Sequence, residues 1–136
     1  MRFVFQLRIV TPNRLLLDEE VSEVIAPGSI GEFGVLPDHI TLLGSLEIGT
    51  LSYRTERGLT RLAVRGGFAE VVDNVMTVLA DNAAFAEDID LGTARADLQA
   101  AEAELQRLSP VEESYPATAA KRRWAQACID VASAGR

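Results

Sequence analysis

The stretch Phe68-Ala69-Glu70-Val71-Val72-Asp73-Asn74-Val75-Met76-Thr77-Val78-Leu79-Ala80 contains two short apolar segments joined by two polar residues. Segments rich in valine with period-two alternation are typical of strands. The dipeptide Asp73-Asn74 fits a two-residue hairpin connection. We therefore predict two antiparallel strands, at residues 68–72 and 75–80.

The rest of the N-terminal sequence has the same character. Phe3, Phe5, Leu7 and Ile9 alternate with less apolar residues, which predicts a strand with one apolar face. Turn signals at 11–13, 27–28 and 65–67 separate further short apolar segments. We expect these other strands at 14–18, 21–26, 30–36, 48–54, 59–64 and 83–86. Many short strands with frequent turns predict an antiparallel β-sandwich or barrel over residues 1–86.

From Asp90 onward the chain is rich in alanine and its apolar period changes. Asp90 is a plausible N-cap for a first helix, which Ser109-Pro110 ends. Ser114 is a candidate cap for a second helix, with Pro116 in its first turn. Apolar residues recur at helical spacing in both: Leu91, Ala94, Leu98, Ala101, Leu105 and Leu108, then Ala117, Ala120, Trp124, Ala127 and Val131. Residues 87–136 are therefore predicted to form an antiparallel helical hairpin, and the fold class is α+β.

The seam of this hairpin is mostly alanine and buries little apolar area per turn. One interpretation is a marginally stable unit that can detach and extend along a larger partner. The other is an ordinary packed appendage. The sequence leaves both open.

Charge and composition exclude several classes of protein. The 136 residues carry a net charge of −7, which argues against nucleic-acid binding and against docking on anionic lipid. No apolar run approaches the roughly 20 residues that span a bilayer, so no direct membrane insertion is expected. The chain opens into strand-like sequence, so we expect no signal peptide. Cys128 is the only cysteine, which favours a reducing compartment.

Motifs for enzymatic chemistry are missing from the sequence. It contains no glycine-rich phosphate loop that continues into Lys-Ser or Lys-Thr, and no Gly-x-Ser-x-Gly elbow. A single histidine, His39, and a single cysteine cannot build a typical zinc site. We expect no metal and no catalytic residue, and a binding or mechanical role rather than an enzyme.

The stretch Gly31-Glu32-Phe33-Gly34-Val35-Leu36-Pro37-Asp38-His39-Ile40 is the best candidate for contact with a partner. Glycine and proline restrict it to a shaped, semi-rigid loop that follows a short strand. Glu32, Asp38 and His39 are its polar content, and loops on rigid scaffolds often carry binding residues. A tight connection with merely solvated polar residues explains the same composition.

These residues resemble a known family. The match covers Thr11-Pro12-Asn13-Arg14, the 31–39 stretch, Gly66-Gly67-Phe68-Ala69-Glu70-Val71 and Thr77-Val78-Leu79-Ala80-Asp81. Together they resemble the epsilon subunits of F-type ATP synthases. The resemblance implies a ten-stranded β-sandwich, a two-helix hairpin and a non-catalytic place in the central stalk. It also implies a peripheral position at the cytoplasmic face of the bacterial inner membrane.

The resemblance further implies particular contacts. Glu32 and His39, with Phe33 and Asp38, would meet the gamma subunit and the ring of c subunits. The two helices would either fold onto the sandwich or extend and block ATP hydrolysis. The candidate residues for contact with the alpha and beta subunits are then Lys121, Arg122 and Arg123.

Some members of that family bind ATP on the folded hairpin through an Ile/Leu-Asp-x-x-Arg-Ala motif. Here Thr93 replaces the arginine, so the cation that could hold a phosphate is missing. The residues left for such a site are Ile89, Asp90, Ala94 and Arg122. We expect ATP binding to be weak or absent, and no cofactor.

The sequence is also compatible with two other functions. One is a stand-alone β-sandwich binding module that oligomerises through its hairpin. The other is a small enzyme that uses His39 and a nearby carboxylate.

Overall fold

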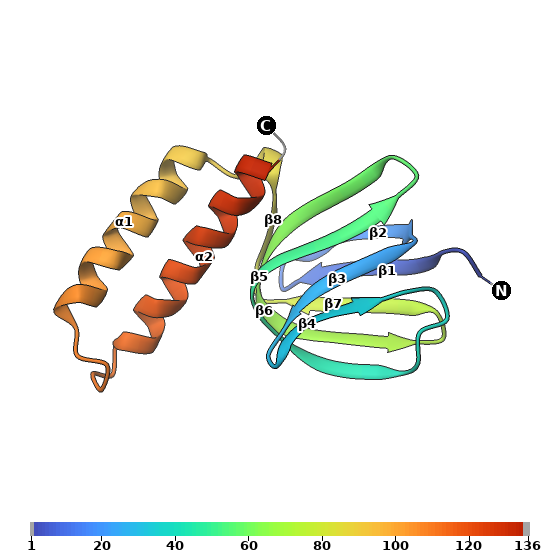
Figure 1. Cartoon of the computed structure of the whole chain (residues 1–136), viewed down its shortest axis with the longest axis horizontal. Helices are drawn as coiled ribbons and strands as arrows, with labels where there is room; N and C mark the ends of the chain where they lie inside the picture. Colours follow the sequence, from blue (N-terminus) through green and yellow to red (C-terminus); the bar gives the residue numbers. More distant parts are fainter. Residues whose placement is uncertain (1, 135–136) are drawn as a thin grey trace.

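The computed structural model describes residues 2–134 and consists of a strand domain with two helices packed on one side (Figure 1). Within this range there are eight strands, one short 3-10 turn and two helices. The strands are β1 (Phe5–Thr11), β2 (Arg14–Val21), β3 (Glu23–Gly28), β4 (Gly31–Val35), β5 (Leu42–Thr55), β6 (Gly58–Val72), β7 (Val75–Ala80) and β8 (Ala83–Phe85). After the turn η1 (Ala86–Asp88) come α1 (Leu91–Arg107) and α2 (Tyr115–Ala134).

The strands form one continuous sheet that folds over on itself, in the order β2-β1-β7-β6-β5-β3-β4, with β8 added to β6. Neighbouring strands are antiparallel except β1 and β7, which run parallel. The predicted hairpin at 68–80 is confirmed, because β6 and β7 pair from Gly67↔Ala80 to Val72↔Val75. Its two turn residues, Asp73 and Asn74, have φ of +50° and +64°, the left-handed region that Asp and Asn tolerate better than most side chains.

The expected ten strands appear as eight because β5 and β6 are long and bent. They have 14 and 15 residues and pair along their whole lengths. The predicted break at 65–67 is a bend inside β6, where Gly67 has a φ of +110°. A Cβ on Gly67 would lie 1.9 Å from the carbonyl oxygen of Leu79, so the bend requires glycine. Each bent strand serves both layers, so dividing both at the bend restores the ten segments.

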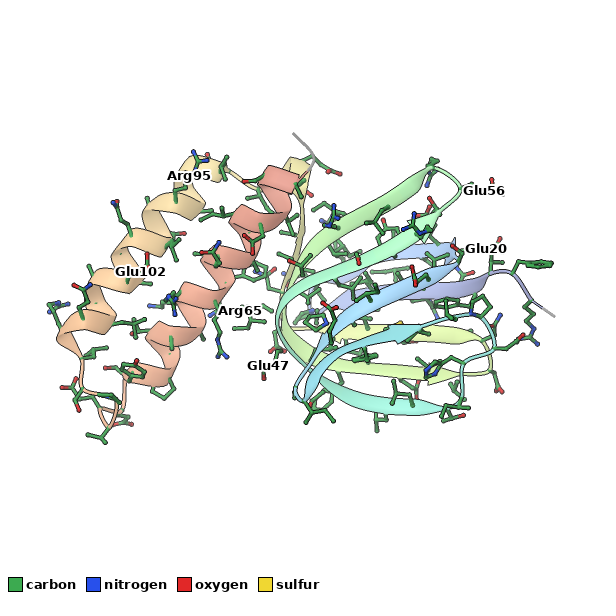
Figure 2. The ribbon with its side chains drawn as sticks, in the orientation of Figure 1. Glu20, Glu47, Glu56, Arg65, Arg95 and Glu102 are labelled. Atoms are coloured by element: carbon green, nitrogen blue, oxygen red, sulfur yellow. The ribbon has the colours of Figure 1, made fainter. Side chains whose placement is uncertain are left out.

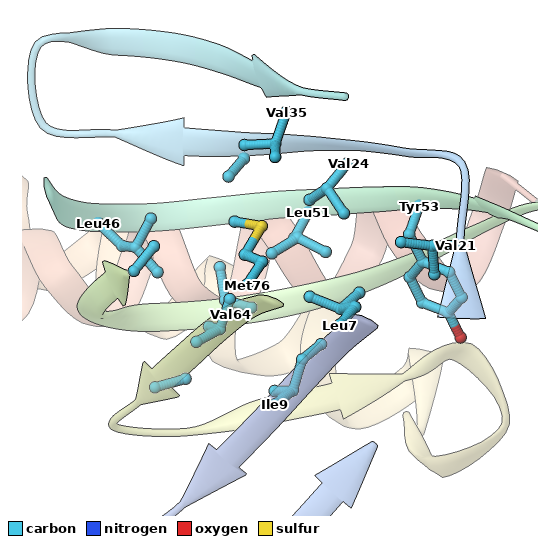
Figure 3. Packing of buried hydrophobic residues seen from close by; sticks show 14 of the residues in the cluster. Leu7, Ile9, Val21, Val24, Val35, Leu46, Leu51, Tyr53, Val64 and Met76 are labelled. Carbon is cyan, nitrogen blue, oxygen red and sulfur yellow. The ribbon is translucent and has the colours of Figure 1, made fainter. Parts of the chain in front are cut away.

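The core lies between the two layers of the folded sheet (Figure 3). Phe5, Leu7 and Ile9 of β1 are buried, as the alternation predicted, whereas Phe3 lies before β1 and is 78% exposed. The other large, fully buried side chains on the described strands are Val21, Val24, Val35, Leu51, Leu62, Val64, Val71, Met76 and Val78. This apolar filling makes the strand domain the rigid part of the molecule.

The first helix matches the sequence prediction closely. Asp90 is its N-cap and accepts a hydrogen bond of 3.0 Å from the Thr93 backbone N–H. The side chains of α1 and its C-cap that are not exposed are Leu91, Ala94, Leu98, Ala101, Leu105 and Leu108. These are the six residues of the predicted stripe.

The second helix has two buried faces, whereas the sequence predicted one. It lies between α1 on one side and strands β5 and β6 on the other (Figure 1). The predicted residues Ala127 and Val131 are buried, but Ala117 is exposed. The prediction missed a second buried face, which comprises Thr118, Ala125, Cys128 and Ala132. At the start of the helix the Ser114 carbonyl, rather than its hydroxyl, accepts hydrogen bonds from the N–H and Oγ1 of Thr118.

Candidate partner-contact surfaces

The stretch from Gly31 to Ile40 is a strand followed by a turn. Gly31 pairs with Gly28 at the β3–β4 hairpin, and Val35 pairs with Val24 at the other end of β4. Glu32 therefore lies beside the hairpin, whereas Asp38 and His39 follow the far end. A strand rises about 3.3 Å per residue, so Glu32 and Val35 are roughly 10 Å apart. The four candidate residues occupy two sites rather than one loop.

At the hairpin end, Glu32 is exposed, and its carboxylate makes no hydrogen bond or ion pair with any other residue in the range 2–134. Phe33 is half-buried and packs over Gly28, where an added Cβ would lie 2.9 Å from the ring. The hairpin loop is tied to β5 by a hydrogen bond between the Ser29 and Ser45 hydroxyls, whose oxygens are 2.6 Å apart. Glu32 is thus available to a partner, while Phe33 stabilises the hairpin that carries it. The fully exposed Ile30 beside them was not anticipated.

At the far end, Asp38 is committed to contacts within the chain. Its backbone N–H donates to Asn74 Oδ1 at 2.8 Å, and its carboxylate lies 3.6 Å from Arg2 Nε. The turn is closed by a 3.2 Å hydrogen bond from the His39 N–H to the Leu36 carbonyl. His39 Nδ1 lies 2.7 Å from the Ile40 carbonyl oxygen and donates to it as the Nδ1–H tautomer. His39 is therefore oriented by its own backbone and is presented beside the exposed Leu36 and Ile40.

A row of exposed apolar side chains crosses the outer face of the sheet. Phe68 on β6 pairs with Leu79 on β7, Leu79 with Val10 on β1, and Val10 with Leu15 on β2. Phe68 is 57% exposed and Leu79 is 53% exposed, which is unusual for neighbouring large side chains. We call Phe68, Leu79, Val10 and Leu15 the outer apolar row. The sequence analysis missed it, although apolar residues on both alternating faces of the 68–80 hairpin were the available signal.

The three basic residues of α2 have different environments. Arg122 Nε lies 3.8 Å from Glu102 Oε2 on α1. Arg123 Nη1 lies 3.1 Å from Glu47 Oε2 on β5. Glu102 and Glu47 thus approach α2 from opposite sides (Figure 2). Lys121 is exposed and makes no ion pair within the described range. In the folded hairpin, two of the three cations are already paired.

The residues expected at an ATP site have structural roles. Asp90 caps α1, and Arg122 is paired with Glu102. Ile89 and Ala94 pack in the cluster that joins the hairpin to the outer face of β6 at Ala63. A cavity of about 590 Å³ lies farther along the hairpin, beside Arg65, Lys121 and Trp124, and none of the four expected residues lines it. In the folded hairpin, the two polar residues of the expected site, Asp90 and Arg122, therefore already have partners within the chain.

Among residues 2–134, no three His, Cys, Asp or Glu side chains are placed to share a metal ion. Neither α1 nor α2 has the length and apolar character that crossing a membrane requires.

Comparison with known proteins relates the chain to one family. Residues 4–86 match the family model described as the ATP synthase delta/epsilon chain, beta-sandwich domain. The chain is 42% identical over 130 residues to ATP synthase epsilon chain 2 of Syntrophotalea carbinolica, covering 96% of this chain and 94% of that protein. It is 51% identical over 107 residues to the ATP synthase epsilon chain of Nitratidesulfovibrio vulgaris, covering 79% of this chain and 78% of that one.

Solved structures give the same relationship. A chain in the cryo-EM structure of the Euglena gracilis mitochondrial ATP synthase, OSCP/F1/c-ring, superposes with a TM-score of 0.80 at 26% identity, covering 93% of this chain and 79% of that one. A chain from the Tetrahymena thermophila mitochondrial enzyme, at 15% identity and a TM-score of 0.57, shares the fold. These matches argue against the stand-alone module and the small enzyme. The chain belongs to the ATP synthase delta/epsilon chain family and is a non-catalytic subunit of the central stalk.

Proposed function

We propose that this subunit couples rotation of the gamma subunit to the c-ring through its β-sandwich and restrains ATP hydrolysis through its helical hairpin. One observation carries the proposal. The two parts differ in how they are held: the sandwich has an extended core of large buried side chains, whereas α2 is attached by a smaller cluster and one ion pair. The buried centre of that cluster is mostly alanine with Cys128 and Val131, and its larger members Trp124 and Ile129 are only partly buried. Coupling requires a rigid domain that stays bound to its partners, and inhibition requires a helical hairpin that can detach.

The outer apolar row supports a contact with the gamma subunit. Leu79 and Phe68 pair across β7 and the C-terminal half of β6 and are both exposed, whereas α2 contacts β6 at Ala63. Exposed apolar groups of this size are typical of protein interfaces, because burying each side chain contributes on the order of 1.5–3 kcal/mol. Leu43, 75% exposed on β5, extends the same surface.

Glu32 supports a contact with the c-ring. It is exposed, carries no internal partner within residues 2–134, and lies on a hairpin braced by Phe33 and by the Ser29–Ser45 hydrogen bond. A carboxylate on a stiff hairpin can form charge-assisted hydrogen bonds to basic loops and resist slip under torque. His39, at the other end of β4, would form a second and separate contact.

The ion pairs of α2 support a releasable inhibitory arm. Arg122 and Arg123 are neutralised by Glu102 and Glu47 while the hairpin is folded. When the hairpin extends, these cations and Lys121 become free to meet acidic surfaces of the alpha and beta subunits. The complex then lies at the cytoplasmic face of the bacterial inner membrane, with this subunit bound peripherally.

Removal of residues 88–136 tests the inhibitory role. In the assembled ATP synthase, this truncation should leave assembly intact and raise the rate of ATP hydrolysis. A rate equal to that of the intact enzyme would remove inhibition from the proposal.

Glu32→Lys tests the c-ring contact. We expect it to lower proton pumping per ATP hydrolysed, or to reduce assembly, because a cation replaces the carboxylate that faces basic loops. Glu56→Lys, at the tip of the β5–β6 hairpin far from the helices (Figure 2), is the matched control for charge reversal. Full coupling in the Glu32 variant would exclude this contact.

A further inference from the structure

Asn74 connects three segments of the chain that are distant in sequence. Its side-chain Oδ1 accepts a hydrogen bond of 2.8 Å from the Asp38 N–H, and its Nδ2 donates one of 2.9 Å to the Val4 carbonyl. Its backbone carbonyl accepts a hydrogen bond of 3.1 Å from the Gln6 N–H. The β6–β7 hairpin, the residues leading into β1 and the turn after β4 are therefore tied together at one amide group.

The Asp38 turn has one hydrogen bond of its own, from the His39 N–H to the Leu36 carbonyl, and Asn74 adds a bond from outside the turn at the residue that needs it most. Asp38 has a φ of +60°, a conformation that a non-glycine residue adopts only at a cost unless surrounding contacts hold it. Within residues 2–134, the other polar contacts of Asp38 are with Arg2, whose N lies 3.3 Å and whose Nε lies 3.6 Å from the carboxylate oxygens. The Arg2 and Asp38 side chains are 60% and 50% exposed, so this pair contributes little.

We propose that Asn74 is the positioning residue for the Asp38–His39 turn and thereby fixes where His39 meets its partner. This inference rests on the proposed function for the role of His39, although the placement of the turn does not. His39 follows Asp38 directly and closes the turn through its own N–H to Leu36. A shift of the Asp38 backbone therefore moves the imidazole with it.

The chemistry at position 74 is specific to asparagine. The site needs an acceptor for the Asp38 N–H, a donor for the Val4 carbonyl and a residue that tolerates a φ of +64°. Aspartate supplies the acceptor but places a carboxylate against a carbonyl oxygen. Glycine supplies the backbone conformation but neither hydrogen bond. Comparing these two substitutions separates the contribution of the Asn74 side-chain hydrogen bonds from that of its backbone conformation.

Amide hydrogen exchange of the full chain, followed by NMR, tests the placement. In Asn74→Gly the Asp38 amide should exchange about tenfold faster, which corresponds to loss of one hydrogen bond. Asp73→Gly is the matched control, because it changes the neighbouring turn residue, whose side chain makes no hydrogen bond within residues 2–134, and should leave the Asp38 amide unchanged. The Leu7 amide in the core should be unaffected in both variants, which excludes global unfolding as the cause.

A second experiment tests function. ATP synthase is depleted of this subunit and then reconstituted with each variant. Asn74→Gly should weaken rebinding, and combining it with His39→Ala should weaken rebinding no further, because both changes act through the same imidazole. Rebinding of the Asn74→Asp variant should be stronger than that of Asn74→Gly and weaker than that of the native chain. An unchanged Asp38 exchange rate, or additive losses in the double variant, would overturn the positioning role. Normal rebinding and coupling of both His39→Ala and Glu32→Lys would instead contradict the proposed function.

Discussion

Arg123 Nη1 on α2 lies 3.1 Å from Glu47 Oε2 on β5, and within the described residues this is the ion pair that joins the hairpin to the sandwich. The two side chains are 52% and 46% exposed, so the pair contributes on the order of 0.2–1 kcal/mol. The apolar part of the same interface consists largely of small side chains such as Ala63, Ala127 and Cys128. A modest change in either the ion pair or the apolar contacts should therefore shift the equilibrium between the docked and the released hairpin.

Glu47→Gln should release the hairpin more often. The amide cannot neutralise Arg123, so the docked state loses up to about 1 kcal/mol, and the effect should disappear at high salt because exposed ion pairs are screened. Hydrogen exchange of the α2 amides measures the opening. Glu56→Gln, on the hairpin tip far from the helices, is the control. Equal protection of α2 in both variants would show that the ion pair does not hold the hairpin.

Cys128 should report the same opening chemically. Its side chain is buried between α2 and the sheet, so a thiol-reactive disulfide can reach it only when the hairpin moves away. We expect slow labelling of the native chain and faster labelling of Glu47→Gln. Rapid labelling of the native chain, at the rate of an unfolded control, would contradict a docked resting state.

Alkaline pH should destabilise the fold through Cys128. Burial, with Asp97 nearby, raises the pKa of its thiol above the ordinary value of 9.0. Because the folded state holds this proton more tightly, its contribution is complete below pH 9.0 and is lost as pH rises toward the folded pKa.

The matching experiment compares the free energy of unfolding in urea at about pH 8 and about pH 10. The native chain should lose more stability over this interval than Cys128→Ala does. Tyr53, whose pKa burial raises above 10.0, contributes equally to both proteins. Parallel losses would assign the alkaline effect to groups other than the thiol.

Gly67→Ala should destabilise the sandwich by about 3 kcal/mol or more, because a methyl group would overlap the Leu79 carbonyl and force a φ of +110° on alanine. Gly44→Ala is the control, since an added Cβ there meets nothing within 4 Å. The change at Gly44 should alter stability by less than about 1 kcal/mol. Urea unfolding of both variants measures the difference, and similar midpoints would contradict the steric argument.

Calorimetry with ATP should show no micromolar affinity. Asp90 and Arg122 are committed to the α1 cap and to Glu102, and Thr93 offers no cation to a phosphate. Asp90→Ala should therefore weaken α1 by about 1 kcal/mol through loss of the cap, without any effect that depends on ATP. A micromolar dissociation constant would contradict the structural role assigned to these residues.

Local sequence patterns were enough to predict most of the strands and both helices. The alternation of Leu7 and Ile9 and the turn at Asp73-Asn74 predicted strands, and the spacing from Leu91 to Leu108 predicted the buried face of α1. The ten strands that the resemblance implied are eight within the described range, because β5 and β6 each run on through the bend. For β6 the sequence could not show this, since the pair Gly66-Gly67 signals a bend and a break equally well. The second buried face of α2 was missed because alanine, threonine and cysteine carry little periodic signal of their own.

The sequence named candidate contact residues but could not show how they are arranged. Glu32 and His39 are seven residues apart in the chain, yet strand β4 places them at opposite ends of one element. The long-range bond from Asn74 to Asp38 could not be inferred from sequence, since it joins two turns that only the completed sheet brings together. Residue type is enough to nominate candidates for partner contact, whereas the bonds that hold those candidates in place depend on tertiary packing.

The parallel pairing of β1 with β7 sets an order of events during synthesis. Gln6 leaves the ribosome early, but its partner Val75 is translated after most of the sandwich has already emerged. Until then, β1 presents an unpaired edge and the apolar side chains of Leu7 and Ile9 to solvent. The nascent chain therefore completes this domain in one late step, and a transcript cut short before β7 yields an aggregation-prone product rather than a smaller working subunit.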